Sequence, residues 1–203
     1  MRFSPCISLL LLTPPSSVRG FAVHPPSTSA SASTSTSLHA IGVLARRAKE
    51  ADVKAYVLSG PSPAVLAHLA TISAFSDALP PADAPPGPLQ SSLTRRRGTV
   101  SIVAEYTRRT ASAFVNGEVP PPELLGETFR EGGAHAVAVA CDPRTGGCTY
   151  DDLAAVVGEQ ARAAGEVPGP LPVIAADVVV DAVQVARAAA EGAAAVLVGA
   201  GTV

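Results

Sequence analysis

Thr99-Val100-Ser101-Ile102-Val103-Ala104-Glu105-Tyr106 opens the part of the chain that decides the fold, residues 99–203. In this part, short apolar runs alternate with segments whose apolar residues recur every three to four positions. We expect strands at 100–106, 136–140, 172–178 and 194–198, and helices at 122–129, 150–164 and 181–191. Short apolar strands separated by helices predict a parallel sheet with right-handed crossovers.

Four such units allow two arrangements. They form half of an eight-unit barrel, or they form a small doubly wound sheet that is complete by itself. A dinucleotide-binding sheet carries a glycine-rich phosphate-binding turn after its first strand. No such turn follows residues 100–106, which argues against that class of fold.

Three motifs within residues 99–203 resemble a known family, the indole-3-glycerol-phosphate synthases. Residues 101–112, SIVAEYTRRTAS, resemble the family pattern V-I-A-E-I-K-R-x-S-P-S, and residues 131–139, EGGAHAVAV, resemble A-G-G-A-x-A-I-S-V. Residues 171–193 resemble L-P-V-L-R-K-D-F-I-I-D-x-x-Q-V-x-x-A-x-x-x-G-A. The resemblance implies a TIM (β/α)8 barrel, of which about the first four βα units are present, preceded by an N-terminal helical extension.

The resemblance also implies a reaction. The family closes the ring of carboxyphenylamino-deoxyribulose phosphate with loss of carbon dioxide and water, a step of tryptophan biosynthesis that needs no cofactor. A lysine that ends the first strand and another that ends the third supply cationic and proton-donating chemistry in the family. Both positions lie at the carboxyl ends of strands, where barrel active sites are found. The expected small-molecule partner is therefore a phosphorylated, anthranilate-derived compound.

This chain departs from the family at both lysine positions. Thr107 stands at the first and Ala176 at the second. A threonine hydroxyl carries no charge, and an alanine methyl neither donates nor accepts a proton. Loss of a general acid costs about two to four orders of magnitude in rate. The family's substrate-packing aromatic residues are replaced as well, by Thr145 and Val178, so we expect weak activity or none.

Some functional positions are retained. Glu105 matches the catalytic glutamate that the family carries on its first strand. The alternative is a buried carboxylate bonded to a neighbouring strand, and a specific contact is expected in either case. Thr110 and Ser112 keep hydroxyls where the motif has serines that contact substrate. Arg108 and Arg109 either place positive charge near an anionic ligand or form a solvated loop pair, and the second interpretation is favoured.

Other polar residues are assigned structural roles. We expect Asp177 and Asp181 to organise a strand-to-helix turn and to cap the helix that follows. Cys141 and Cys148 fit neither a zinc site nor a redox pair, so they are interpreted as structural thiols. The four histidines are scattered without helical pairing, and no metal site is expected.

The N-terminal part divides into three segments. Residues 1–40 combine a short apolar run, small residues near Gly20 and a Ser/Thr/Ala tract without acidic residues. This pattern is typical of a cleavable signal followed by a transit segment, which predicts the plastid stroma as destination. A disordered tail or a misplaced gene start is the alternative. Residues 41–75 form a helical extension, and residues 76–98 are expected to be a proline-rich linker.

Charge and topology limit the partners. A formal net charge of −2 gives no reason to propose nucleic acid or an anionic membrane. The apolar run near the N-terminus is too short for a retained span, which needs about 20 residues. A sheet of four units leaves two open edges, which favour self-association or a separately encoded second half. Two hypotheses follow: an impaired synthase homologue, and a non-catalytic half-barrel acting in assembly or ligand binding; a fragment of a longer gene is a further alternative.

Overall fold

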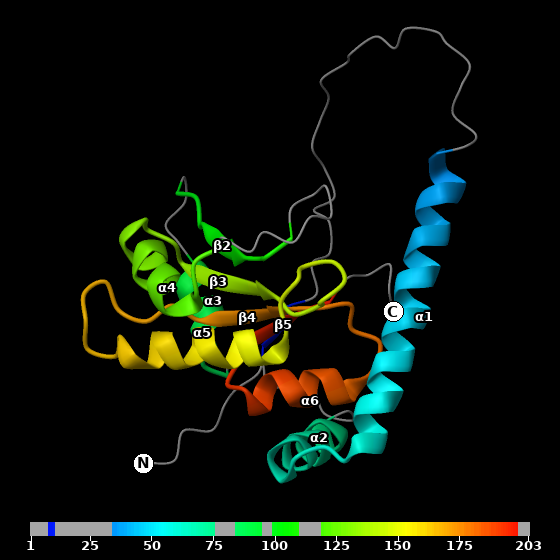
Figure 1. Ribbon diagram of the computed structural model, residues 1–203. Coiled ribbons are helices and arrows are strands. Elements are labelled where there is room, and N and C mark those ends of the chain that lie inside the picture. The colour runs from blue at the N-terminus through cyan, green and yellow to red at the C-terminus, as the bar shows by residue number, and fades with distance from the viewer. Residues whose placement is uncertain (1–7, 11–33, 76–83, 95–98, 110–118, 199–203) are drawn as a thin grey trace, which may run out of the picture.

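The computed structural model describes residues 8–10, 34–75, 84–94, 99–109 and 119–198 (Figure 1). The elements in chain order are β1 Ser8–Leu10, α1 Thr34–Ser59, α2 Pro63–Phe75, α3 Pro88–Leu93, β2 Val103–Tyr106, α4 Pro122–Glu131, β3 Ala136–Ala140, α5 Tyr150–Arg162, β4 Val173–Ala176, α6 Ala182–Ala190 and β5 Ala195–Leu197. Strands and helices alternate from β2 onward, as the sequence predicts. The expected α/β class is confirmed.

The strands form one parallel sheet in the order β1-β5-β4-β3-β2. Strands that follow one another from β2 to β5 are neighbours, with Glu105 opposite Ala138 and Ala138 opposite Ile174. A doubly wound sheet reverses its strand order part-way and carries helices on both faces. The consecutive order therefore fits part of a TIM-barrel-like sheet.

Helices α4, α5 and α6 pack on one face of this sheet (Figure 1). Val137 and Val139 of β3 pack there in one buried cluster with Leu153 and Val156 of α5. Because side chains alternate along a strand, the residues between them face the other way. The sheet thus has a helix-covered face and a second face, which we call the inner face.

Two helices of the covering layer begin with capping boxes. The Thr149 hydroxyl accepts hydrogen bonds from backbone amides in the first turn of α5, and the Asp152 carboxylate accepts one from the Thr149 amide. Asp181 and Gln184 form the same arrangement at α6, with Asp181 accepting from the Val183 amide at 2.8 Å. The cap predicted for Asp181 is therefore confirmed.

Among the described residues, the inner face has a hydrophobic cover at the amino ends of the strands. Leu89 of α3 packs there on Ala136, Ile174 and Ala195. Helix α3 lies inside residues 76–98, which were expected to be a linker without helix; it begins at Pro88, where proline is compatible with a first helical turn. A short helix thus covers the inner face at the amino ends of the strands.

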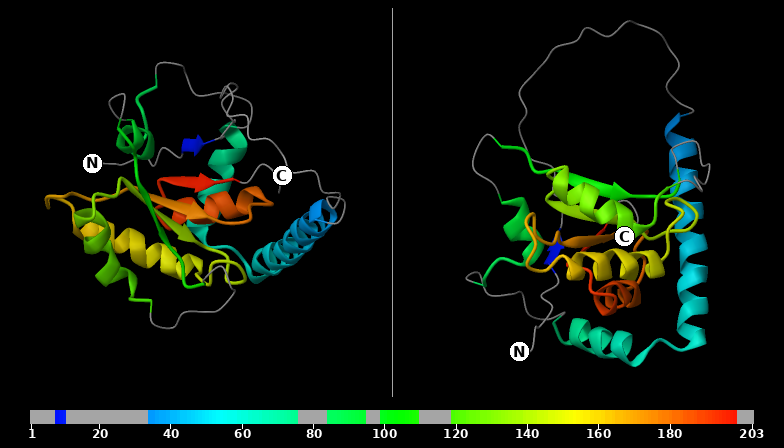
Figure 2. Two further views of the ribbon diagram at one scale, coloured as in Figure 1. Left: turned by 90° about the horizontal axis from the view of Figure 1, so that it is seen from above. Right: turned by 60° about the vertical axis from the view of Figure 1, so that its left-hand side comes forward.

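Helices α1 and α2 form a corner beside this sheet. Val65 of α2 is buried against Val183 and Ala186 of α6, and the Ser62 hydroxyl accepts a hydrogen bond from the Val65 amide at the start of α2. Helix α1 begins at Thr34, seven residues before the expected boundary at 41, and stands beside the carboxyl ends of the strands (Figures 1 and 2).

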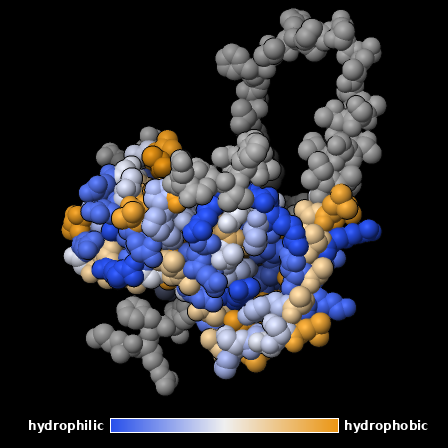
Figure 3. Space-filling view, viewed as in Figure 1, coloured by the Kyte–Doolittle hydropathy of each residue, from blue (hydrophilic) through white to orange (hydrophobic). Residues whose placement is uncertain are grey.

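Val43, Leu44, Val57 and Leu58 of α1 are exposed, and Figure 3 shows hydrophobic surface on this side of the molecule. Among the described residues, no helix alone is long and apolar enough to cross a membrane. The bent pair Gly42–Ser59 and Pro63–Ala74 has the length and apolar composition of a span only when the two helices are taken together. Most of residues 1–40 lie outside the described part of the chain. Strand β1 comes from the apolar run of that segment and pairs with β5.

Candidate functional site

Glu105 and Ala176 lie on the inner face, as the resemblance implies. The register pairs Glu105 with Ala138, and two residues further along it pairs Ala140 with Ala176. Both residues therefore point away from α4, α5 and α6, near the carboxyl ends of their strands. Glu105 is exposed, so the alternative of a buried carboxylate is wrong, while its role as the retained family glutamate stays a prediction; β2 lies at the edge of the described sheet.

Thr107 does not present a free hydroxyl. Its Oγ1 donates to the carbonyl oxygen of Gly146 at 2.9 Å and lies 3.2 Å from the carbonyl oxygen of Arg109. These contacts tie the end of β2 to the loop between β3 and α5. Thr110 and Ser112 lie outside the described residues, so their expected contact with substrate stays a prediction.

The two arginines after β2 pack onto the same loop. Arg108 pairs with Asp152 of α5 at 2.6 Å, and the Arg109 guanidinium donates to the Arg144 carbonyl oxygen. Both side chains are half-buried. The favoured interpretation of a solvated loop pair is therefore wrong, because the arginines hold the β2 and β3 loops together.

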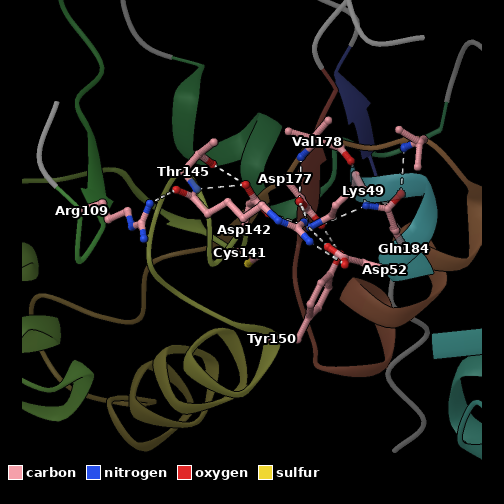
Figure 4. Close-up of polar contacts among 12 residues, drawn as sticks. Lys49, Asp52, Arg109, Cys141, Asp142, Thr145, Tyr150, Asp177, Val178 and Gln184 are labelled. Carbon is pink, nitrogen blue, oxygen red and sulfur yellow. Dashed lines mark hydrogen bonds and ion pairs between the residues drawn. The ribbon is translucent and has the colours of Figure 1, made fainter. Parts of the chain in front are cut away.

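A residue that the sequence analysis missed, Lys49 of α1, enters the carboxyl rim of the sheet (Figure 4). Its Nζ lies 2.5 Å from Asp177 Oδ1 and 3.3 Å from Asp142 Oδ1, and exposure of the three side chains is 7%, 1% and 7% respectively. Asp142 follows β3 and Asp177 follows β4. The ammonium thus joins α1 to the ends of two neighbouring strands.

Asp177 is the centre of this network. Its Oδ2 accepts from the Tyr150 hydroxyl at 2.9 Å and from Gln184 Nε2 at 3.0 Å, while Oδ1 accepts from the Val178 amide at 2.7 Å. The role predicted for Asp177, organising the turn after its strand, is confirmed. Val178, at a family aromatic position, contributes its backbone to this turn.

The electrostatics of the network follow from burial and pairing. Burial would raise the pKa of Asp142, but the Thr145 hydroxyl and the Lys49 ammonium outweigh it and hold this pKa below its ordinary value. Burial, together with the nearby Asp177 carboxylate, raises the pKa of the Tyr150 hydroxyl well above its ordinary value. Thr145, at another family aromatic position, therefore serves as a hydrogen-bond donor to Asp142.

The two cysteines are buried and free. Burial, with a contribution from Asp177, raises the pKa of the Cys141 thiol to about 12. Burial also raises the pKa of Cys148. Both thiols are therefore protonated near neutral pH and poorly nucleophilic, which agrees with a structural role.

A second set of contacts holds α1 nearby. The Arg187 guanidinium lies between two tyrosine rings, 4.5 Å from the centroid of Tyr56 and 4.2 Å from that of Tyr150. Arg144 forms a two-pronged ion pair with Asp52 of α1. These side chains and Lys49 line a cavity of about 470 Å³ between α1 and the rim.

This cavity is separate from the inner face. Asp177 follows Ala176 and Cys141 follows Ala140, so alternation turns the cavity residues away from the inner face. Lys49 is also paired with two carboxylates, so the formal net charge of Lys49, Asp142 and Asp177 together is negative. It therefore does not replace the cation missing at Ala176. Within the described ranges, no group of three or more histidine, cysteine or acidic residues could hold a metal ion.

Comparison with curated proteins supports the family resemblance seen in the sequence motifs. The chain is similar to indole-3-glycerol phosphate synthases. It is 31% identical to that of Mycobacterium tuberculosis over 137 residues, 68% of this chain and 47% of the relative. It is 36% identical to the synthase of Kineococcus radiotolerans over 117 residues, which are 58% of this chain and 39% of that relative. No family model matches the chain. The chain thus spans less than half the length of these synthases.

Proposed function

We propose that this chain is a divergent indole-3-glycerol-phosphate synthase homologue whose β2–α6 units and β5 correspond to the N-terminal half of that barrel. The observation that carries the proposal is the consecutive parallel order of β2, β3, β4 and β5 in a chain similar to these synthases. The three sequence motifs fall on the matching strands. The substrate class that follows is a phosphorylated anthranilate-derived compound.

The inner face would supply only part of the chemistry. Glu105 offers a carboxylate near the carboxyl end of β2, where barrel enzymes bind substrate. Ala176 offers no polar group, and the Thr107 hydroxyl already bonds to Gly146. A substrate with carboxylate and phosphate groups gains its binding energy from cations and directed N–H donors. We propose that turnover by this chain is weak or absent.

A second candidate function is a non-catalytic half-barrel that acts in assembly or ligand binding. The observation that favours it is the use of Lys49, the cation buried at the rim, to neutralise Asp142 and Asp177. Its ammonium group is already paired with these carboxylates and attaches α1 to the sheet. On this hypothesis the fold is kept while the lysine chemistry is lost.

The test is an assay of the purified full chain with carboxyphenylamino-deoxyribulose phosphate, followed by the fluorescence of the indole product, with binding measured by calorimetry. We expect no turnover, or turnover reduced by about two to four orders of magnitude relative to an intact synthase. Ala176→Lys should strengthen substrate binding, and Leu124→Lys, an added lysine on the exposed surface of α4, is the matched control.

The outcomes separate the hypotheses. Robust product formation that is lost in Glu105→Gln would show that the assigned lysine positions are not essential. Robust formation that survives Glu105→Gln would contradict the placement of the site on the inner face. Equal, undetectable binding by Ala176→Lys and Leu124→Lys would support the non-catalytic half-barrel.

We also propose that residues 1–40 direct the protein to a plastid stroma. The support is compositional: an apolar run, then an acid-free Ser/Thr/Ala tract that opens with Phe21. A fluorescent protein fused after residue 40 should accumulate inside plastids of an alga whose plastids have extra membranes. Retention of the fusion in the cytosol would contradict the proposal.

A further inference from the structure

Arg187 of α6 is a cation that aromatic rings hold in place. Its guanidinium carbon lies 4.5 Å from the ring centroid of Tyr56 of α1 and 4.2 Å from that of Tyr150 of α5. Within the described part of the chain, this guanidinium has no hydrogen-bond acceptor and no ion pair. The N–H bonds of a guanidinium lie in its plane, so rings over its faces leave the donors unused.

These unused donors belong to a cavity-lining residue. Arg187 is half-buried and lines the cavity of about 470 Å³ between α1 and the carboxyl rim. This volume lies within the range of small-molecule sites, about 300–1,000 Å³. A partly desolvated cation without acceptors is unfavourable, and a bound oxyanion would supply them. A guanidinium whose orientation is already fixed also loses little side-chain entropy when it binds.

The other cations of the cavity lining are already neutralised. Lys49 is paired with Asp177 at 2.5 Å. Arg144 is paired with Asp52 across two hydrogen bonds. Asp151 also lines the cavity, and its carboxylate has no ion pair among the described residues. One unpaired cation in surroundings that are otherwise neutral or negative suits a monoanion and disfavours a phosphate dianion.

The remaining lining is apolar. Val53 of α1, Pro143 after β3 and Val183 of α6 contribute aliphatic surface to the cavity, beside the two tyrosine rings. Binding sites of this size gain most of their affinity from such surface and use a few polar groups to orient the ligand. The lining therefore indicates a ligand with an apolar body and one anionic group.

We propose that this cavity binds a small monocarboxylate with an apolar body, whose two carboxylate oxygens accept a bidentate pair of hydrogen bonds from Arg187. Guanidinium and carboxylate groups match in this planar geometry. The site is separate from the inner face and does not depend on activity there. Because the cavity lies between α1 and α6, the bound ligand also holds α1 against the rim and stabilises the folded chain.

The experiment titrates the purified full chain with cyclohexanecarboxylate, followed by calorimetry and by near-ultraviolet circular dichroism. The chain has three tyrosines and no tryptophan, and two of the tyrosines lie against Arg187, so this dichroism reports on the site. We expect saturable binding with a dissociation constant of about 1 mM or lower, as for a small ligand with one anchor. The neutral cyclohexanecarboxamide should not bind, and inorganic phosphate should bind more weakly.

Four variants test the assignment. Arg187→Gln removes the cation and should weaken binding about tenfold or more, and Arg187→Lys, which keeps the charge but loses the planar fork, should lie between. Asp151→Asn removes a negative charge from the lining and should strengthen binding about two- to threefold. Arg162→Gln, at an exposed arginine in the last turn of α5, is the control and should bind as the native chain does.

Val53→Phe provides a test that keeps Arg187 and both tyrosines. It fills part of the cavity from α1, so it should weaken binding about as much as Arg187→Gln does; far-ultraviolet circular dichroism checks that each variant is folded. Three results would overturn the proposal: no binding by the native chain, native affinity in a folded Arg187→Gln or Val53→Phe protein, and phosphate binding as tight as that of the carboxylate. The last result would show that the ligand class is wrong.

Discussion

Replacing Lys49 with methionine tests the network at the carboxyl rim. The variant keeps the length of the side chain but leaves Asp142 and Asp177 without their shared cation. All three side chains are more than nine-tenths buried, so solvent does not screen their attraction. Removing one partner of a buried ion pair costs about 3–5 kcal/mol, because a buried charge is left uncompensated. We expect a loss of this size in the free energy of unfolding, measured by urea denaturation at neutral pH.

The pH dependence of that loss follows from the direction of the Asp142 pKa. In the native protein this pKa is lowered, so the carboxylate contributes stability above its unfolded pKa, and the contribution disappears as the pH falls through the folded value. Without Lys49, the Asp142 pKa loses two of the contributions that lower it and shifts upward. The difference between native protein and variant should therefore be largest near neutral pH and shrink as the pH falls from the Asp142 pKa of the variant to the lower Asp142 pKa of the native protein.

Lys54→Met is the matched control, since Lys54 is an exposed lysine of the same helix. It should change the free energy of unfolding by less than about 0.5 kcal/mol, as surface substitutions do. Hydrogen exchange of α1 gives a second measurement, because Lys49 joins this helix to the rim. A Lys49→Met protein within about 1 kcal/mol of the native stability, with α1 protection unchanged, would refute the reasoning.

Two further substitutions test the helix layer. Gly126→Ala places a methyl group against the Glu159 carboxylate, which is buried and already paired with Arg130, and should lower the free energy of unfolding by about 1–3 kcal/mol in chemical denaturation. Gly158→Ala is the control, because its added methyl meets no atom within 4 Å, and it should be neutral or stabilising. Equal losses of stability in both variants would contradict this packing. Asp181→Ala removes the cap of α6 and should cost about 1 kcal/mol, whereas Asp181→Asn should keep most of the stability. An asparagine variant as unstable as the alanine variant would show that charge, rather than capping, matters there.

The regular part of the fold could be predicted because its signals are local. β3 was expected at 136–140 and lies at Ala136–Ala140, where an apolar run follows a pair of glycines. The α6 cap was found from Asp181 alone, since the residue type and its position at the end of a turn specify the hydrogen bond. Helix α3 was missed because the prolines before it were given more weight than Pro88 as a first helical residue.

The candidate site could be predicted only in part, because its contacts are tertiary. The family resemblance was sufficient to assign Glu105 and Ala176 to the strands that carry the family's functional residues. Alternation does not say how far water reaches a face, and the alternative of a buried carboxylate at Glu105 was wrong although an open edge at this strand was expected. Lys49 was missed because nothing in the sequence fixes which turn of α1 meets the rim. The only local signal was an aspartate soon after each of two neighbouring strands, Asp142 and Asp177, which together require a cation when buried.

The carboxyl rim therefore has two sides with different roles. On its outer side, Lys49, Asp142 and Asp177 form a dense network that fixes α1. On its inner side, the positions expected to carry chemistry hold an exposed glutamate, a threonine bonded to a loop and an alanine. Because alternation separates the two sides, stability and ligand binding should vary independently. Lys49→Met should destabilise the fold without weakening the binding of a ligand near Glu105. Glu105→Gln should change ligand binding while leaving the free energy of unfolding nearly unchanged. A common loss in both variants would mean that the two sides form one site.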